Sequence, residues 1–313
     1  MTIRRSRVLR GALAATAATV ALAATAGTAF AAGDPAGRAR AEAVAERQQV
    51  RESARAGALA ADDAPVETPS FALTAVHKQS FEFYLYFPNY AGGFEPRDHI
   101  AIPVPEWADS IDVDNDKDGS ADGGWTVYKD GTIDYTYIDE ELNFHEVQVG
   151  TGWNTYRTVL SPGSIGGAKE ADLLGVDKAG VLWSYLAYPN GKVTPRHRVG
   201  GGWGQYTQVE GQGDLTGDGK ADIVARDKTG VLWLYKGTGD YKAPFAARTK
   251  IGGGWNTFDR ILSVGDLDLD GRSDLIARKP NGDLLRYSGS GSAAAPFQQP
   301  VKIGHGFQIY NLL

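Results

Sequence analysis

Short apolar segments alternate with Gly, Pro, Asn and Asp over most of this chain, which is typical of β-strands joined by tight turns. Between Trp255 and Gly306 the pattern predicts four strands, near Phe258–Val264, Asp274–Arg278, Asp283–Tyr287 and Phe297–Ile303. The run VLWLY at Val231–Tyr235 is apolar without alternation, as expected for a strand that is covered on both faces. The pattern therefore predicts an all-β unit of short antiparallel strands.

This unit recurs with a period of about 50 residues. A Gly-rich string that ends in an aromatic residue appears as VGTGW, VGGGW, IGGGW and IGHGF, ending at Trp153, Trp203, Trp255 and Phe307. A weaker copy, AGGF, ends at Phe94. An acidic loop follows the same period, with its last carboxylate at Asp122, Asp172, Asp222 and Asp274. Because two unrelated features share one period, we interpret the unit as a structural repeat.

Four-stranded repeats of about 50 residues are typical of β-propeller blades. We expect complete repeats at about 94–152, 153–202, 203–254 and 255–306. Residues 71–93 and 307–313 supply strands that belong to no complete repeat, so they are expected to meet in one composite blade that closes the ring. The sequence thus predicts a five-bladed propeller over residues 71–313.

The N-terminal part of the chain has a different composition. Residues 1–31 combine several arginines, an Ala-rich apolar run and the sequence Ala29-Phe30-Ala31, which together predict a signal peptide and a secreted, extracellular protein. The export route, general secretory or twin-arginine, stays open. Residues 32–70 are rich in Ala, Arg and Glu but have too few large apolar residues for a packing stripe, so we interpret them as a flexible or partly helical linker. A cleaved pro-segment or a partner-binding helix is the alternative.

Composition and charge narrow the class of partner. The chain has 313 residues and no cysteine, so it has neither disulfides nor thiolate metal sites. Its formal net charge is −6, and it falls to −10 without residues 1–31, with 28 basic and 38 acidic residues remaining. An acidic protein is a poor candidate for nucleic acid, and nothing after the signal peptide is long and apolar enough to span a membrane. Cations are the expected partners.

The acidic loops have the spacing of a calcium loop. Oxygen ligands at the first, third, fifth and ninth positions, a backbone carbonyl at the seventh and Gly at the sixth can surround Ca²⁺. The expected ligands are Asp114, Asp116, Asp118, Ser120 and Asp122; Asp214, Thr216, Asp218, Lys220 and Asp222; and Asp266, Asp268, Asp270, Arg272 and Asp274. Ser120, Lys220 and Arg272 would act only through their carbonyl oxygens.

One copy of the loop serves as an internal control. Between Ser164 and Asp172 only the last carboxylate is retained, so we predict about three calcium sites and no metal in this copy. Asp and Gly are also ordinary turn residues, and capping of backbone N–H groups is the alternative role for the acids. Three copies of the full spacing favour calcium over this alternative, and magnesium fits less well because it retains water in an octahedral shell.

Beyond the spacing, the string GDLTGDGKADIVARDKTGVLWLYKGTG, which begins at Gly213, resembles the FG-GAP or VCBS-type repeats of exported bacterial proteins. The resemblance covers roughly residues 90–313 and implies blades with a calcium loop between the first two strands, as in the head domain of integrin α chains. The unit is shorter here, and the chain is too short for seven blades. The period and the Gly-Gly-Trp strings are also similar, more weakly, to tachylectin-type five-bladed lectins, which bind amino sugars.

No nucleophile motif, zinc-protease motif or phosphate loop occurs, so the sequence predicts a protein that is not an enzyme. The recurring Trp153, Trp203 and Trp255 are expected in the core between blades, and sugar-stacking in grooves between blades is their alternative role.

The leading hypothesis for the function is a calcium-stabilised binding module for extracellular or cell-wall carbohydrate. A protein-interaction scaffold assembled through residues 32–70 is the second hypothesis. A hydrolase is the third, and it would require two facing carboxylates in a pocket outside the loops.

Overall fold

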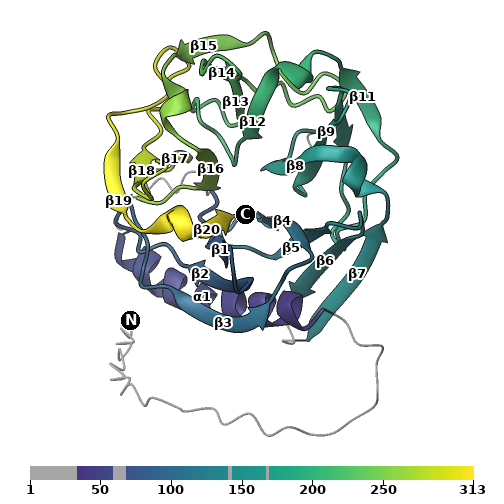
Figure 1. Cartoon of the computed structure of the whole chain (residues 1–313), viewed down its shortest axis with the longest axis vertical. Helices are drawn as coiled ribbons and strands as arrows, with labels where there is room; N and C mark the ends of the chain where they lie inside the picture. Colours follow the sequence, from purple (N-terminus) through teal and green to yellow (C-terminus); the bar gives the residue numbers. More distant parts are fainter. Residues whose placement is uncertain (1–33, 59–67, 140–142, 167–168) are drawn as a thin grey trace, which may run out of the picture. The chain divides into compact units, whose positions relative to one another are not determined.

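Five sheets of four antiparallel strands form a ring around a central axis in the computed structural model, which describes residues 34–58, 68–139, 143–166 and 169–313 (Figure 1). This confirms the predicted all-β, five-bladed propeller. The predicted signal peptide, residues 1–31, lies outside the described residues.

Four blades are built from continuous sequence, each with its strands in chain order from the axis outwards. Their strands are β4 (Trp107–Val113), β5 (Gly123–Tyr128), β6 (Ile133–Ile138) and β7 (Phe144–Gly150) in the first blade; β8 (Tyr156–Gly163), β9 (Asp172–Asp177), β10 (Leu182–Tyr185) and β11 (His197–Gly200) in the second; β12 (Tyr206–Glu210), β13 (Ile223–Asp227), β14 (Leu232–Tyr235) and β15 (Thr249–Gly252) in the third; and β16 (Arg260–Gly265), β17 (Asp274–Arg278), β18 (Leu284–Tyr287) and β19 (Val301–Gly304) in the fourth.

The fifth blade, here called the closing blade, joins the two ends of the propeller sequence. Its strands are β20 (Tyr310–Leu312), β1 (Leu73–His77), β2 (Glu82–Tyr86) and β3 (Asp98–Pro103). Ala75 pairs with Leu312, so the inner strand comes from the C-terminal end of the described chain. The composite closure that the repeat pattern predicts is therefore present.

The first repeat begins later than the sequence suggested. Phe94 bridges Pro88 within the closing blade, as Phe297 bridges Gly289 within the fourth blade, so AGGF is not a copy of the Gly-Gly-x-Trp string. Since β3 follows Phe94 and is the outer strand of the closing blade, the first continuous blade begins at Trp107 rather than at residue 94. AGGF resembles the Gly-Gly-x-Trp string because the connection before an outer strand is also rich in glycine.

Short 3₁₀ helices carry the chain from each outer strand to the next inner strand: η1 (Trp153–Thr155), η2 (Trp203–Gln205), η3 (Trp255–Thr257) and η4 (Phe307–Ile309). Each is preceded by a glycine with φ between 81° and 92°, a conformation that other residues rarely adopt. This geometry accounts for the glycine-rich strings of the repeat.

The aromatic residue after each string lies in the core between two blades. Trp153, Trp203 and Trp255 are 6%, 7% and 8% exposed, and each ring packs on an aromatic side chain at the end of its blade's third strand. The ring centroids of Trp203 and Tyr235, for example, are 4.7 Å apart in a stacked arrangement. A ring that is covered in this way cannot stack on a sugar, so the structure corrects the alternative that places these three tryptophans in a ligand groove.

Three arginines, of which Arg226 and Arg278 are buried and Arg157 is exposed, connect neighbouring blades. Arg226 in β13 donates from Nη1 to the backbone oxygens of Trp255 (3.0 Å) and Phe258 (2.5 Å) in the next blade. Arg278 in β17 makes the same pair of bonds to Phe307 and Tyr310, and Arg157 in β8 makes them to Trp203 and Tyr206. Because each arginine donates to backbone carbonyl groups of the neighbouring blade, these charge-assisted bonds help to hold the ring together.

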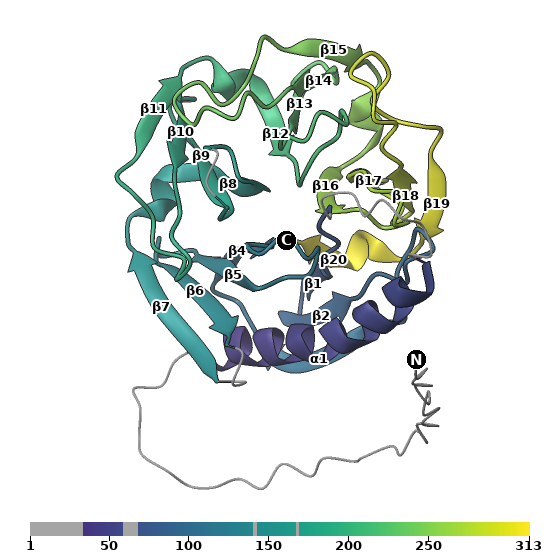
Figure 2. The ribbon, with the colours of Figure 1, turned by 180° about the vertical axis from the view of Figure 1, so that it is seen from behind.

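The linker region folds onto the propeller. Helix α1 (Pro35–Ala58) packs against β3, β5, β6 and β7, along the edge of the closing and first blades (Figure 2). Ala36 is buried, and Arg40 is only 5% exposed because its guanidinium group forms an ion pair with Asp112 (2.6 Å) and donates to Thr74. We expected a flexible or partly helical segment without a packing face. Its described part is a docked helix, held by a small residue and a buried charge.

Candidate metal centres and the loop face

The predicted metal loops join the first and second strands of the continuous blades. Asp114–Asp122 connects β4 to β5, Asp214–Asp222 connects β12 to β13, and Asp266–Asp274 connects β16 to β17. In each loop the sixth residue is a glycine with positive φ, between 79° and 83°. The loop turns sharply at this residue, as the calcium-loop spacing requires.

The first and last aspartates hold each loop in shape. In the Asp114 loop, Asp114 accepts from the backbone N–H groups of Lys117 and Gly119, both at 2.7 Å. Asp122 accepts from Asn115 and Asp116 across the loop. The capping role that Asp commonly has in turns is therefore present here together with the clustering of carboxylates.

Carboxylates converge in two of the three loops. Within the described ranges, oxygens of Asp114, Asp116 and Asp122 lie within 4.8 Å of one another, and so do those of Asp266, Asp268 and Asp274. These are the first, third and ninth positions of the predicted calcium loop. Hard oxygen atoms at this spacing are the donors that Ca²⁺ prefers.

The fifth-position aspartates do not join these clusters. Asp118 accepts from the N–H group of Ser120, and Asp270 pairs with Arg272 beside it. In the third blade, Asp218 pairs with Lys236 (2.9 Å) and no cluster of three carboxylates forms among the described residues of that loop. Where the sequence predicts four carboxylates per site, the structure brings together three in two loops. The Asp214 loop is the weakest of the three candidates.

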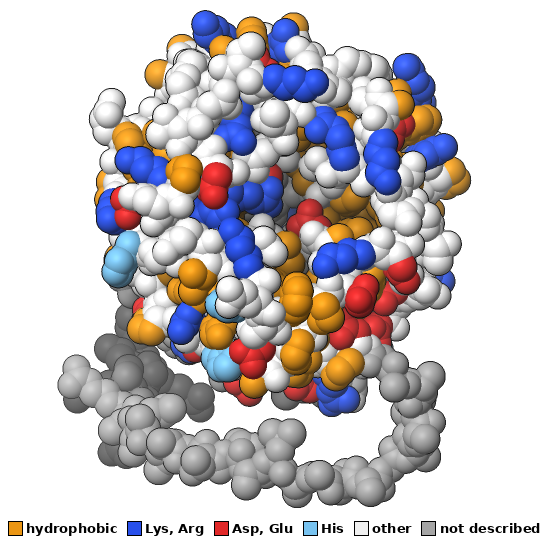
Figure 3. All heavy atoms as spheres, in the orientation of Figure 1, with side chains coloured by type: hydrophobic (Ala, Val, Ile, Leu, Met, Phe, Trp, Pro, Cys, Tyr) orange, Lys and Arg blue, Asp and Glu red, His pale blue; other side chains and the backbone are white. Residues whose placement is uncertain are grey.

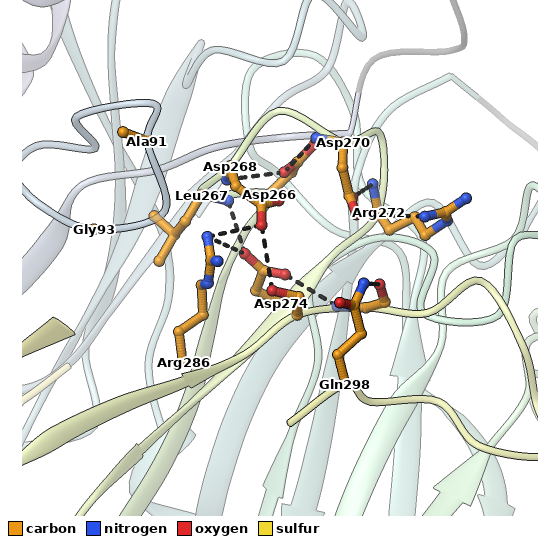
Figure 4. A network of polar contacts seen from close by, with 12 residues as sticks. Ala91, Gly93, Asp266, Leu267, Asp268, Asp270, Arg272, Asp274, Arg286 and Gln298 are labelled. Atoms are coloured by element: carbon orange, nitrogen blue, oxygen red, sulfur yellow. Dashed lines mark hydrogen bonds and ion pairs between the residues drawn. The ribbon is translucent and has the colours of Figure 1, made fainter. Parts of the chain in front are cut away.

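An arginine that the sequence analysis missed enters the Asp266 loop. Figure 4 shows Arg286, from β18, pointing at the carboxylates, with Nη1 2.8 Å from Asp268 and 3.9 Å from Asp274. Its register in the blade corresponds to Leu234 of β14, because both residues follow the first residue of the third strand by two. The different residue type at one repeat position was the signal that could have revealed it.

The carboxylates in these clusters resist ionisation. Burial, together with the neighbouring carboxylates, raises the pKa of Asp114 to about 7 and that of Asp274 to about 7. The same two causes raise the pKa of Asp266 to about 6, although a backbone N–H group of Gly271 opposes them. The charged forms of these groups therefore lack sufficient compensation within the chain, and Arg286 compensates only the Asp266 loop.

The donor set fits a hard cation. Asp268 Oδ1 is buried and has no hydrogen-bond partner among the described residues, which is the state of an oxygen that is available to a metal ion. By contrast, Asp172 in the reduced copy is fully buried and uses its carboxylate to accept from the backbone of Ile165, Gly166 and Ala187. The carboxylate of Asp172 thus acts as a backbone cap in that copy.

The loops of all four continuous blades border one depression, which we call the loop face. Its volume is about 560 Å³. Its described lining residues include Asp114 and Asp214 from two loops and a basic residue from each of the four copies: Lys117, Lys169, Lys220 and Arg272. The loop face therefore presents carboxylates and cationic side chains side by side.

A family comparison assigns the repeat. Residues 214–277, which run from the third-blade loop through β13–β15 and into β17 of the fourth blade, match the model of the FG-GAP-like repeat. This segment of the propeller is thus similar to an FG-GAP-like repeat, and the resemblance drawn from the sequence is confirmed. The weaker resemblance to five-bladed lectins stays a prediction. No curated protein matches this chain.

Solved structures with a similar fold are distant in sequence. Prp20p from Saccharomyces cerevisiae is 11% identical, with a TM-score of 0.34, over 72% of this chain and 60% of its own. The Nup133 β-propeller domain from Vanderwaltozyma polyspora is 10% identical, with a TM-score of 0.37, over 78% of this chain and 75% of its own. This chain thus spans less than two thirds of Prp20p, and at such low TM-scores neither likeness supports an argument about function.

Among the helices of the described residues, none has the length and apolarity needed to cross a membrane.

Proposed function

We propose that this protein is an exported, calcium-stabilised propeller that binds extracellular or cell-wall carbohydrate at the loop face. A propeller of FG-GAP-like repeats is a binding or scaffold module, which gives the coarse function. The observation that carries the finer proposal is the loop face itself, a depression of about 560 Å³ to which four blades contribute charged side chains. Carboxylates and lysines together can accept from and donate to the hydroxyl groups of a sugar chain.

Calcium would be held by the clusters Asp114, Asp116, Asp122 and Asp266, Asp268, Asp274. When bound, the ion supplies positive charge that compensates the buried carboxylates and fixes the loops. The loops border the depression, so we expect their order to determine the shape of the loop face. Carbohydrate binding at this face should therefore depend on calcium.

The proposal that the protein is exported rests on residues 1–31. Determining the mature N-terminus by mass spectrometry on protein from the culture medium would test it.

Binding is tested with insoluble cell-wall polysaccharides and a glycan array, with calcium and with chelator. We expect the polysaccharides to retain the wild-type protein only when calcium is present. The substitutions Lys117→Ala and Lys169→Ala should each reduce this retention. Lys192→Ala, an exposed lysine outside the loop face, is the matched control. Retention that is absent in calcium, or that is unchanged by both loop-face substitutions, would contradict carbohydrate binding at this face.

The position of α1 affects the alternative proposal that the protein is an interaction scaffold. A partner-binding arm should be free, but the described part of α1 is docked through Arg40 and Ala36. Deleting residues 32–70 would therefore disturb the ring as well as any partner. A pull-down tests this alternative better with substitutions at Glu42 and Glu46, which are exposed on the helix.

A further inference from the structure

A second cavity lies inside the ring. It has a volume of about 260 Å³ and is lined by the inner strands β4, β8, β12 and β16 together with residues of the closing blade. Figure 3 shows that the ring is hollowed at its centre, where acidic and basic side chains meet. This axial channel is distinct from the metal loops, although Gln212 lines both cavities.

One position of the repeat gives the channel four different polar side chains. Each inner strand pairs with the second strand of its blade in the same register, and the channel residues at this position are Asp109, Thr158, Gln208 and Arg260. The corresponding position opposite Ile111, Leu160, Glu210 and Leu262 keeps its apolar character, with Trp125, Leu174, Val224 and Ile276. The channel position instead changes from an acid to neutral residues to a base, so its chemical character is not dictated by the packing of the repeat.

The next channel position is more informative. In the same register the blades carry Ile111, Leu160 and Leu262, but the third blade carries Glu210. An aliphatic residue at this position satisfies the fold in three blades. Burial of an acid in place of leucine is unfavourable unless the charge is compensated. Glu210 is thus a departure from the repeat that packing does not require, and such a departure is typical of a functional site.

The acids and the arginine of the channel form one group. Arg260 Nη1 lies 2.9 Å from Glu210 Oε1, and the charge of Arg260 also acts on Asp109. Burial nevertheless raises the pKa of Asp109 to about 6 and that of Glu210 to about 7. Arg260 Nε and Ser110 Oγ are buried without a hydrogen-bond partner among the described residues. The channel thus contains polar atoms whose hydrogen-bonding capacity the protein does not use.

The balance of charge indicates the kind of ligand. The charged side chains that line the channel are three carboxylates and three guanidinium groups: Asp109, Asp112, Glu210, Arg40, Arg157 and Arg260. A strongly cationic or anionic ligand would leave this balance uncompensated. The volume lies below the ~300 Å³ at which pockets for drug-sized ligands begin, so a single ring fits and a longer molecule does not. Carboxylates beside a guanidinium group can bind the adjacent hydroxyls of such a ring.

We propose that the axial channel binds one neutral sugar ring, with Asp109 and Glu210 accepting from its hydroxyl groups and Arg260 donating to them. The proposal rests on the proposed carbohydrate function for the class of ligand, and it adds a second site that does not involve the metal loops. The two carboxylates lie outside the loops, as the hydrolase hypothesis requires. Because Glu210 forms an ion pair with Arg260, we assign the two carboxylates, Asp109 and Glu210, to sugar binding rather than to hydrolysis.

The test is calorimetric titration of the full-length mature protein with glucose, galactose, mannose and N-acetylglucosamine. We expect one of these sugars to bind with a stoichiometry of one, in calcium and equally in chelator. Glu210→Gln and Asp109→Asn should each weaken this binding at least tenfold. Glu95→Gln, which makes the same change at an exposed position outside the channel, should leave it unchanged.

A further variant separates binding from folding. Glu210→Leu combined with Arg260→Met removes both members of the ion pair, so neither charge of the pair is left without its partner. This double variant should bind no sugar and melt at the same temperature as the wild type or higher. A wild type that binds no sugar would overturn the proposal, and a lower melting temperature of the double variant would then identify the pair as structural. Binding that disappears with chelator or with Lys117→Ala would place the sugar on the loop face and also overturn it. Monosaccharide binding without polysaccharide retention would support the channel and contradict the loop-face function.

Discussion

The ion pair between Arg40 and Asp112 should determine whether α1 stabilises the propeller. Arg40 is 5% exposed and Asp112 is 8% exposed, and the two side chains are 2.6 Å apart. Removing one member of a buried pair leaves the other charge uncompensated, which destabilises a protein by about 3–5 kcal/mol. For a domain of this size, about 2–4 °C of melting temperature corresponds to 1 kcal/mol, so Arg40→Met should melt about 6–20 °C lower than the wild type.

Thermal unfolding followed by circular dichroism measures this change. Arg38→Met is the matched control, because Arg38 is exposed on the same helix. Its pair with Glu42 contributes at most about 0.5 kcal/mol, and its cation–π contact with Phe144 of β7 contributes about 0.5–1 kcal/mol at an exposed site. The double variant Arg40→Met with Asp112→Leu should recover much of the loss, since no unpaired charge then remains. If Arg40→Met melts within 2 °C of Arg38→Met, about 0.5–1 kcal/mol by the same conversion, the helix is not anchored by this pair.

Three further predictions concern the metal, the channel and the blade contacts. Chelation should lower the free energy of unfolding by about 2.7 kcal/mol per site if calcium was present at 100 times its Kd. By elemental analysis, Asp274→Asn should bind one calcium ion fewer than the wild type, and Asp172→Asn should bind the same number as the wild type. Equal calcium counts in all three proteins would refute the assignment of the loops. Asp109 and Glu210 have raised folded-state pKa values, so the folded chain holds more protons than the unfolded chain between about pH 4 and 7. In saturating calcium, the free energy of unfolding should therefore fall as the pH rises through this window. Urea titrations of the Asp109→Asn, Glu210→Gln double variant should show a smaller fall, and an unchanged pH dependence would contradict the raised pKa values. Arg226→Met removes the arginine donor from the carbonyls of Trp255 and Phe258, of which only Trp255 keeps a backbone donor, the N–H of Phe258. It should destabilise by about 1–3 kcal/mol in urea unfolding. A loss below 0.5 kcal/mol, as is usual for an exposed substitution, would show that these bonds are dispensable.

The repeat pattern carried most of the information about the fold. Strands predicted near Asp274–Arg278 and Asp283–Tyr287 are β17 and β18 with nearly the same bounds, because turns of Gly, Asn and Asp limit the possible registers. The period also predicted the number of blades and the composite closure. The error at Phe94 arose where an irregular connection contained the same glycine–aromatic combination as the repeat. Local composition cannot separate these two cases, since only the pairing partners differ.

The parts of the site that escaped prediction depend on contacts between distant residues. Arg286 reaches the Asp266 loop from another strand, and Arg40 reaches Asp112 from a helix with a weakly apolar sequence. The loop spacing predicted the clustering of the first, third and ninth carboxylates, but Asp118 and Asp270 found nearby partners instead. Glu210 became conspicuous only after the strand register aligned it with Ile111, Leu160 and Leu262.

The closing blade has a consequence for the synthesis and refolding of the chain. Ala75 of β1 pairs with Leu312 of β20, residues that are about 240 positions apart, and ordering so long a loop opposes closure by about 5 kcal/mol of chain entropy. During translation, β4–β19 can form blades one after another, but β1 must wait with an unpaired inner edge until β20 has been made. Ring closure is therefore expected to be the slow step of folding, and an exposed strand edge at this stage is a site for aggregation.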